Sequence, residues 1–152
     1  MSTQLSDMSS GVLVTGVGAP PGLGTLRSLK QADPALKLVA ADINALAGGL
    51  YEPGTTGCVL PPAGDREAYR TAVRELCARE RLDTIIPGSE AEAAALAPVA
   101  RDWTAEGLRV PVPDPDVLRY GIDKGLLLTR AREAGLPCPV TLQPETGADL
   151  DA

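Results

Sequence analysis

The chain has 152 residues, with 14 Lys and Arg against 20 Asp and Glu, and it contains no histidine. The net charge of −6 argues against a broad nucleic-acid or anionic-membrane surface, and no apolar run approaches the roughly 18 residues that a membrane span needs. Without histidine, the chain cannot build a Ser-His-Asp or Cys-His nucleophile, a His-ligated zinc site or an imidazole base.

The cysteines and the N-terminal residues indicate in which cellular compartment the protein is expected. Cys58, Cys77 and Cys138 are odd in number, lie far apart and form no Cys-x-x-Cys pair, which favours a reduced cytoplasmic setting. Residues 1–10 are small and polar and lack the basic-then-apolar order of a signal peptide. We expect them to form a flexible segment.

Short apolar runs alternate with helical patterns along the chain. The runs predicted as strands lie at residues 12–14, 36–41, 58–60, 84–86 and 108–112. Residues 25–31 form the first helix; Asp65 and Ser89 cap the next two. A short helix follows the fifth run, and Asp123 caps a last helix that points Leu127 and Leu128 inward. This order predicts an α/β fold: a Rossmann-like doubly wound parallel sheet of about five strands with helices on both faces.

The predicted domain organisation follows from the same order. We expect the Rossmann-like domain at residues 11–113, a helical connection at residues 114–142 and a tail at residues 143–152. Pro137 and Pro139 come just after the last helix, which Gly135 ends.

Ligands of a doubly wound sheet bind outside the carboxyl ends of its strands, near the point where the strand order reverses. Three features of the sequence fall at such ends: the glycine-rich loop at residues 16–24, Asp42, and the segment Gly88-Ser89-Glu90. Each has a functional and a purely structural interpretation.

The glycine-rich loop resembles a dinucleotide fingerprint in part. Gly16-x-Gly18 begins one, but its third glycine would fall at Pro21, which has no N–H for a phosphate. Gly18, Gly22 and Gly24 are candidate binding residues. Alternatively, the glycines simply allow a tight turn from strand to helix, with Pro21 near the first helical position.

Asp42, Ser89 and Glu90 are the polar candidates. Asp42 either accepts a hydrogen bond from a ribose hydroxyl or caps the turn that begins at residues 43–44. Ser89, Glu90 and Glu92 either form a capped first helical turn whose acids complement the helix dipole or contact a substrate amine, and Glu90 is the residue to test for that contact.

Several motifs in order resemble one known family. They are Val-Leu-Val-Thr-Gly-Val-Gly at 12–18, Val-Ala-Ala-Asp-Ile-Asn at 39–44, Thr-Ile-Ile-Pro-Gly-Ser-Glu at 84–90, Pro-Val-Pro-Asp-Pro at 111–115, Ile-Asp-Lys at 122–124 and Ala-Gly-Leu-Pro-Cys-Pro at 134–139. The series is similar to the N-terminal pre-ATP-grasp domain of ATP-grasp enzymes, the superfamily of carbamoyl phosphate synthase, biotin carboxylase and carboxylate–amine ligases.

The resemblance implies an ATP-dependent ligase that activates a carboxylate as an acyl phosphate for attack by an amine or another nucleophile. The complete enzyme would use ATP and Mg²⁺, and Lys124 matches a family position that contacts the nucleotide phosphates. By position, the loop from Gly18 to Gly24 and the pair Ser89-Glu90 would line the acceptor-substrate side.

The chain departs from that family because the ATP-grasp module itself is missing. We therefore expect no ligation by this chain alone, no tightly bound cofactor and no metal ligands. The expected partners are an ATP-grasp module in the same or a separate chain and small-molecule carboxylate and amine substrates. An exposed apolar face would also support a homodimer.

An alternative function is an NAD(P)-binding Rossmann module of the epimerase or dehydrogenase type. The Pro20-Pro21 pair and the lack of an epimerase-type Tyr-x-x-x-Lys pair count against it. Saturable binding of NADH or NADPH would favour it.

Overall fold

The computed structural model describes residues 11–141 and divides the chain into two compact units, Met1–Pro113 and Asp114–Ala152. The expected flexible segment at residues 1–10 and the expected tail at residues 143–152 lie outside the described residues. The first unit contains the β-sheet, and the described residues of the second unit form two helices.

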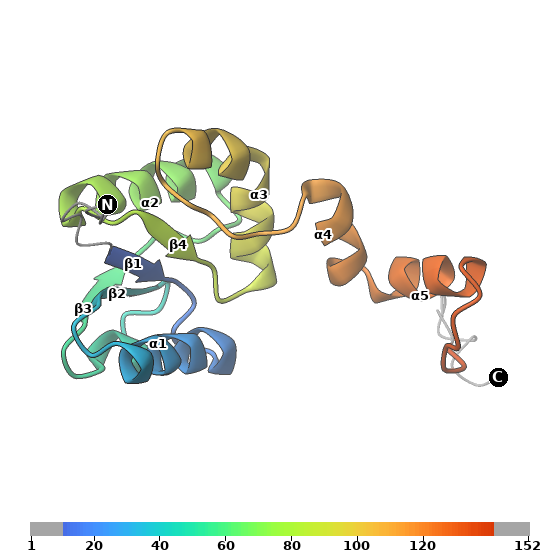
Figure 1. The fold of residues 1–152 in the computed structure, drawn as a ribbon, viewed down its shortest axis with the longest axis horizontal. Coiled ribbons are helices and arrows are strands. Elements are labelled where there is room, and N and C mark those ends of the chain that lie inside the picture. The colour runs from blue at the N-terminus through green and yellow to red at the C-terminus, as the bar shows by residue number, and fades with distance from the viewer. Residues whose placement is uncertain (1–10, 142–152) are drawn as a thin grey trace, which may run out of the picture. The chain divides into compact units, whose positions relative to one another are not determined.

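The sheet of the first unit has four parallel strands, β1 (Gly11–Val14), β2 (Lys37–Asp42), β3 (Thr56–Val59) and β4 (Thr84–Ile86). Their order in space is β3-β2-β1-β4 (Figure 1). The chain moves outward from β1 to β3 and then crosses back to place β4 on the other side of β1. The strand order therefore reverses between β1 and β4, which confirms the predicted Rossmann-like, doubly wound α/β fold.

The connecting segments cover both faces of the sheet. They are α1 (Pro20–Ala32), the 3₁₀ turn η1 (Gly48–Tyr51), α2 (Arg66–Glu80) and α3 (Glu90–Ala105). Figure 1 shows α1 on one side of the sheet and α2 and α3 on the other. Because side chains of a strand alternate between faces, this arrangement demands strands that are apolar on both faces.

Two hydrophobic cores result from that alternation in β1. Leu13 packs on the side of α2 and α3, in a cluster that includes Tyr69 and Leu96. Val14 packs on the opposite side with Leu26 of α1 and Leu50 of η1. Strands β1 and β2 are thus largely buried on both faces, whereas β3 is exposed at the edge of the sheet. A polar ligand can reach the central strands at their carboxyl ends.

The predicted fifth strand at residues 108–112 is not a strand, so the sheet has four strands where the sequence predicts about five. Only Arg109 pairs with the neighbouring strand, in an isolated β-bridge. Its N–H donates to Asp83 at 2.7 Å and its carbonyl accepts from Ile85 at 2.8 Å. Pro111 has no N–H with which to continue the ladder, and the pairing ends there.

Capping side chains and prolines mark the residues at which the helices begin. Ser89 Oγ accepts from the N–H of Glu92 at 3.3 Å, and Asp65 Oδ1 accepts from the N–H of Ala68 at 3.1 Å, which confirms both predicted caps. The first helix begins at Pro20 and not at residue 25 as expected. A proline is tolerated in the first turn because the N–H that it lacks has no partner inside the helix.

The described part of the second unit contains α4 (Pro115–Ile122) and α5 (Lys124–Glu133), and neither helix has a buried residue. The prediction that the apolar side chains of α5 point inward is wrong, since Leu127 is 44% exposed. Two helices of eight and ten residues present too little apolar surface to each other to enclose a core.

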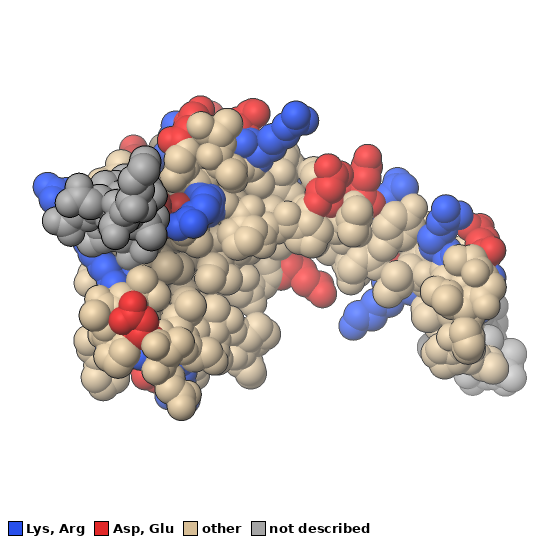
Figure 2. Space-filling model, viewed as in Figure 1, with Lys and Arg blue, Asp and Glu red and all other residues tan. Residues whose placement is uncertain are grey.

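Charged side chains of both signs are interspersed on the face of the molecule in Figure 2.

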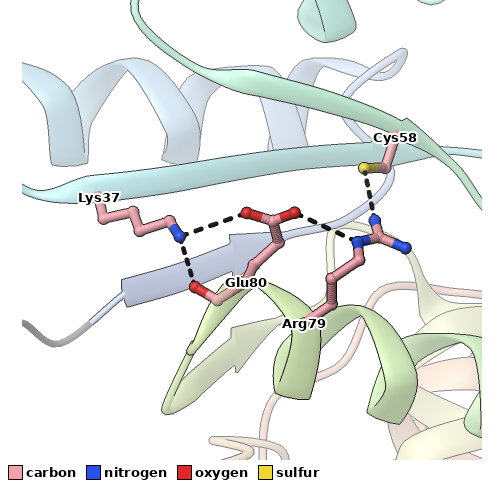
Figure 3. A network of polar contacts seen from close by, with 4 residues as sticks. All are labelled: Lys37, Cys58, Arg79 and Glu80. Atoms are coloured by element: carbon pink, nitrogen blue, oxygen red, sulfur yellow. Dashed lines mark hydrogen bonds and ion pairs between the residues drawn. The ribbon is translucent and has the colours of Figure 1, made fainter.

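One network of polar contacts joins the start of β2 to the end of α2. Figure 3 shows Lys37 and Arg79 on either side of the Glu80 carboxylate, at 3.3 Å each. Hydrogen bonds from Arg79 and Lys37 hold the pKa of Glu80 below its ordinary value. Arg79 also lies 3.6 Å from Cys58 Sγ. These exposed contacts lie outside the site described next.

No helix within residues 11–141 is long and apolar enough to cross a membrane.

Candidate functional site

Three polar or charged residues are buried among the described residues, and all three lie at the same edge of the sheet. Thr15 follows β1, Asp42 ends β2 and Glu92 lies in the first turn of α3, which follows β4. Burial of polar groups is costly, so their concentration at the carboxyl ends of three strands marks a candidate binding site.

A pocket of about 380 Å³ opens at this edge. Its walls are the glycine-rich loop, the turn after β2, Ala63 and the start of α3; the lining includes Gly16, Gly18, Asp42, Ile43, Asn44, Ser89 and Glu92. The volume suits a small-molecule ligand, because such pockets usually measure about 300–1,000 Å³. Two carboxylates line the pocket, and no Lys or Arg does so among the described residues.

Asp42 fixes the shape of the pocket. Its Oδ2 accepts from the N–H of Gly18 at 2.7 Å, and its Oδ1 accepts from the N–H of Asn44 at 2.9 Å. The second contact is the turn-capping role that the sequence offered as one interpretation. Because an ionised carboxylate has about four acceptor positions, Asp42 can still accept hydrogen bonds from a ligand.

The predicted loop glycines have three different environments. Gly18 lines the pocket, whereas Gly24 lies in the open, with no atom within 4 Å of the position of a Cβ. Gly22 is buried, and a Cβ there would lie 2.3 Å from the carbonyl oxygen of Gly16. Gly22 is therefore a packing residue that lets α1 approach the loop, and Gly24 is placed outside the pocket.

The start of α1 is a poor anion site. Its first two residues, Pro20 and Pro21, have no N–H, and the N–H of Gly18 is already bound to Asp42. Phosphate sites at helix starts depend on such N–H groups. The loop can bind a phosphate only through its few remaining donors.

At the start of α3, the carboxylate that lines the pocket is that of Glu92 and not that of Glu90, the residue singled out from the sequence. Glu90 is exposed, while Glu92 is only 5% exposed and lines the pocket. Ser89 Oγ donates to Glu92 Oε2 at 2.8 Å, and Ser89 itself also lines the pocket. The signal for Glu92 is the Ser-x-x-Glu spacing of a capping box, but that spacing does not predict burial.

Tyr69 of α2 lies beneath the pocket and is fully buried. Its hydroxyl donates to Thr15 Oγ1 at 3.5 Å. Burial, followed by the charge of Glu92, raises the pKa of Tyr69 well above its ordinary value. The hydroxyl therefore stays protonated and remains a hydrogen-bond donor in the buried network below the site.

Burial also raises the pKa of the Cys77 thiol, from 9.0 to about 12, and this predicts a loss of stability in alkali. Between those two values the unfolded chain has lost the thiol proton and the native protein keeps it. The native state then binds more protons, so the free energy of unfolding falls as pH rises, by up to about 1.4 kcal/mol per pH unit from this group.

Urea unfolding of the wild type and Cys77→Ala between about pH 8 and about pH 11 tests this expectation. The variant should lose less stability per pH unit than the wild type, whatever its stability at neutral pH. Val73→Ala, which trims a buried side chain of the same helix that has no titratable group, serves as the control and should keep the wild-type slope. Equal slopes for the wild type and Cys77→Ala would contradict the prediction.

Lys124 and metal binding are separate matters from the pocket residues described above. Lys124 is the exposed first residue of α5, in the second unit, and its contact with nucleotide phosphates stays a prediction. Within residues 11–141, no three His, Cys, Asp or Glu side chains are grouped so that they could hold a metal ion.

Comparisons with known proteins give a likeness of fold. No protein-family model matches the chain, and no curated protein matches it. A solved structure that matches is dTDP-glucose 4,6-dehydratase from Bacillus anthracis in complex with NAD, at 13% sequence identity and a TM-score of 0.49. The match covers 66% of this chain and 36% of the dehydratase, so the chain spans about a third of that protein's length.

These findings overturn the resemblance to pre-ATP-grasp domains. The solved structure named above is a dehydratase and not an ATP-grasp enzyme, and no family model matches the chain. The reason lies in the nature of the motifs: strands that end in glycine, proline or aspartate occur at the ligand-binding edge of doubly wound sheets in general. The motif series therefore predicts the fold and not the family.

Proposed function

We propose that the first unit is an NAD-binding module of the Rossmann type. The observation that carries the proposal is the position of Asp42: it ends β2, is 9% exposed, and holds Gly18 of the glycine-rich loop through its side chain. An acid at the end of the second strand is suited to accept hydrogen bonds from ribose hydroxyls beside that loop.

The adenosine half would occupy the part of the pocket next to Asp42. Ile43, which is 58% exposed, and Ala63 also line the pocket and supply apolar surface, as a purine ring requires. The carboxylate of Asp42 is free to accept from the ribose hydroxyls. The same charge repels a phosphate on the ribose, so the site should reject NADP.

The pyrophosphate would lie over the loop at Gly18, because the Glu92 carboxylate lies against Gly16, with Oε2 2.7 Å from the position of a Cβ there. The two prolines at the start of α1 supply no N–H. The pyrophosphate therefore forms fewer hydrogen bonds here, and contributes less binding free energy, than it does at a helix whose first turn has all its N–H donors. We therefore expect the ribose and the rings, more than the pyrophosphate, to provide the affinity. A polyanion such as ATP should bind weakly here.

Titration calorimetry of the full chain with NAD⁺, NADP⁺ and ATP tests the proposal. We expect saturable binding of NAD⁺ and about tenfold weaker binding of NADP⁺ and ATP, because the lining carries two carboxylates and no cation among the described residues. Failure to bind NAD⁺ at millimolar concentration, or equal affinity for NADP⁺, would overturn it.

A further inference from the structure

Glu92 is a buried carboxylate that the binding of the adenosine half leaves unused. It forms none of the ion pairs found among the described residues, and the side chain that donates a hydrogen bond to it is neutral: the Ser89 hydroxyl, at 2.8 Å. An ionised carboxylate is expensive to bury without a counter-ion. A cationic group in the pocket would supply the charge that the protein itself does not.

The surroundings of Glu92 offset its charge only in part, because the first turn of α3 supplies the partial positive charge of a helix N-terminus but no counter-ion. The pocket lining adds a second carboxylate, Asp42, and contains no Lys or Arg among the described residues. The N–H groups that stabilise Asp42 come from Gly18 and Asn44, on the β1 and β2 side of the pocket. A positive charge on a ligand therefore has its most favourable electrostatic interaction on the side of the pocket at α3.

The order of the lining residues gives the direction of the ligand. The lining runs from Asp42 and Ile43 after β2, across Gly16 and Gly18 after β1, to Glu92 after β4. A dinucleotide whose adenosine ribose lies at Asp42 would cross the glycine-rich loop and place its second ring on the side of Glu92. In NAD⁺ this ring carries a positive charge, and in NADH it is neutral.

We propose that Glu92 makes the site select the oxidised form, NAD⁺, over the reduced form, NADH. The inference rests on the proposed function, because it takes NAD as the ligand. The charge on the ring is the main electrostatic difference between the two forms, so a buried carboxylate beside the ring discriminates between them. The adenosine contacts at Asp42 are the same for both forms and do not contribute to the preference.

Calorimetric titration of the full chain with NAD⁺ and with NADH measures this preference. We expect the wild type to bind NAD⁺ about tenfold more tightly than NADH at low salt. Glu92→Gln, which keeps the size of the side chain and removes its charge, should bring the two affinities close together. Glu90→Gln removes an exposed charge in the same helical turn and should keep the wild-type preference.

A third ligand keeps the test independent of how well Glu92→Gln folds. ADP-ribose has the adenosine half and the pyrophosphate but no nicotinamide ring, and it should bind the wild type more weakly than NAD⁺ does. Wild-type affinity for NADH equal to or above that for NAD⁺ overturns the inference, as does an unchanged preference in folded Glu92→Gln. In those cases NAD binding itself stands; if the wild type binds neither form, the proposed function fails instead.

Discussion

Gly22→Ala is expected to lower the free energy of unfolding by about 3 kcal/mol. The added Cβ would lie 2.3 Å from the carbonyl oxygen of Gly16 and 2.7 Å from that of Thr15. Both atoms belong to the backbone at the end of β1, which cannot move aside as a flexible side chain can. The gain of about 1 kcal/mol in helix propensity offsets only part of this cost.

Gly24→Ala is the matched control for that substitution. Gly24 lies in the same helix, and the position of its Cβ is open, with no atom within 4 Å. Here the helix propensity acts alone, and we expect a stabilisation of up to about 1 kcal/mol. Urea unfolding followed by circular dichroism gives both values. Similar shifts of the two midpoints would show that α1 does not pack on the loop as described.

Asp42→Asn is expected to weaken NAD binding by about 100-fold, provided that the proposed function holds. An amide has a single acceptor oxygen, so it can satisfy the N–H of Gly18 or that of Asn44 but not both. Its NH₂ group would face the other N–H, donor against donor. The loop then loses its fixed position, and the ribose loses a charged acceptor.

Asp65→Asn controls for the loss of one negative charge elsewhere in the first unit. Asp65 caps α2, and asparagine caps a helix about as well as aspartate. Calorimetric titration should therefore give this variant the affinity of the wild type, with an unchanged unfolding midpoint. If Asp42→Asn also bound NAD as the wild type does, Asp42 would not be a ligand contact.

Much of the fold could be predicted from short-range patterns. The apolar runs at β1 and β4 and the capping residues Asp65 and Ser89 are visible in the sequence, because caps and strand periodicity depend on neighbouring residues. The prediction of a strand at residues 108–112 was wrong because it depends on long-range interactions. Whether an apolar run becomes a strand depends on pairing with a distant segment, and Pro111 ends that pairing.

The candidate site was predictable only in outline. Asp42 and Ser89 stand at strand ends, where a doubly wound sheet binds ligands, and both line the pocket. The choice between Glu90 and Glu92 could not be made, because the side chains lie two residues apart and point to different sides of the helix. Which of them is buried depends on how α3 is rotated against the sheet.

Three properties follow from the sequence alone: the α/β class, the chemistry that a chain without histidine cannot perform and the edge of the sheet at which a ligand would bind. Which residues form the pocket depends on the tertiary fold. The contacts that build it join residues far apart in the chain, such as Gly18 with Asp42 and Thr15 with Tyr69. Periodicity and capping act over a few residues, whereas burial of Glu92 arises when distant segments close on one another.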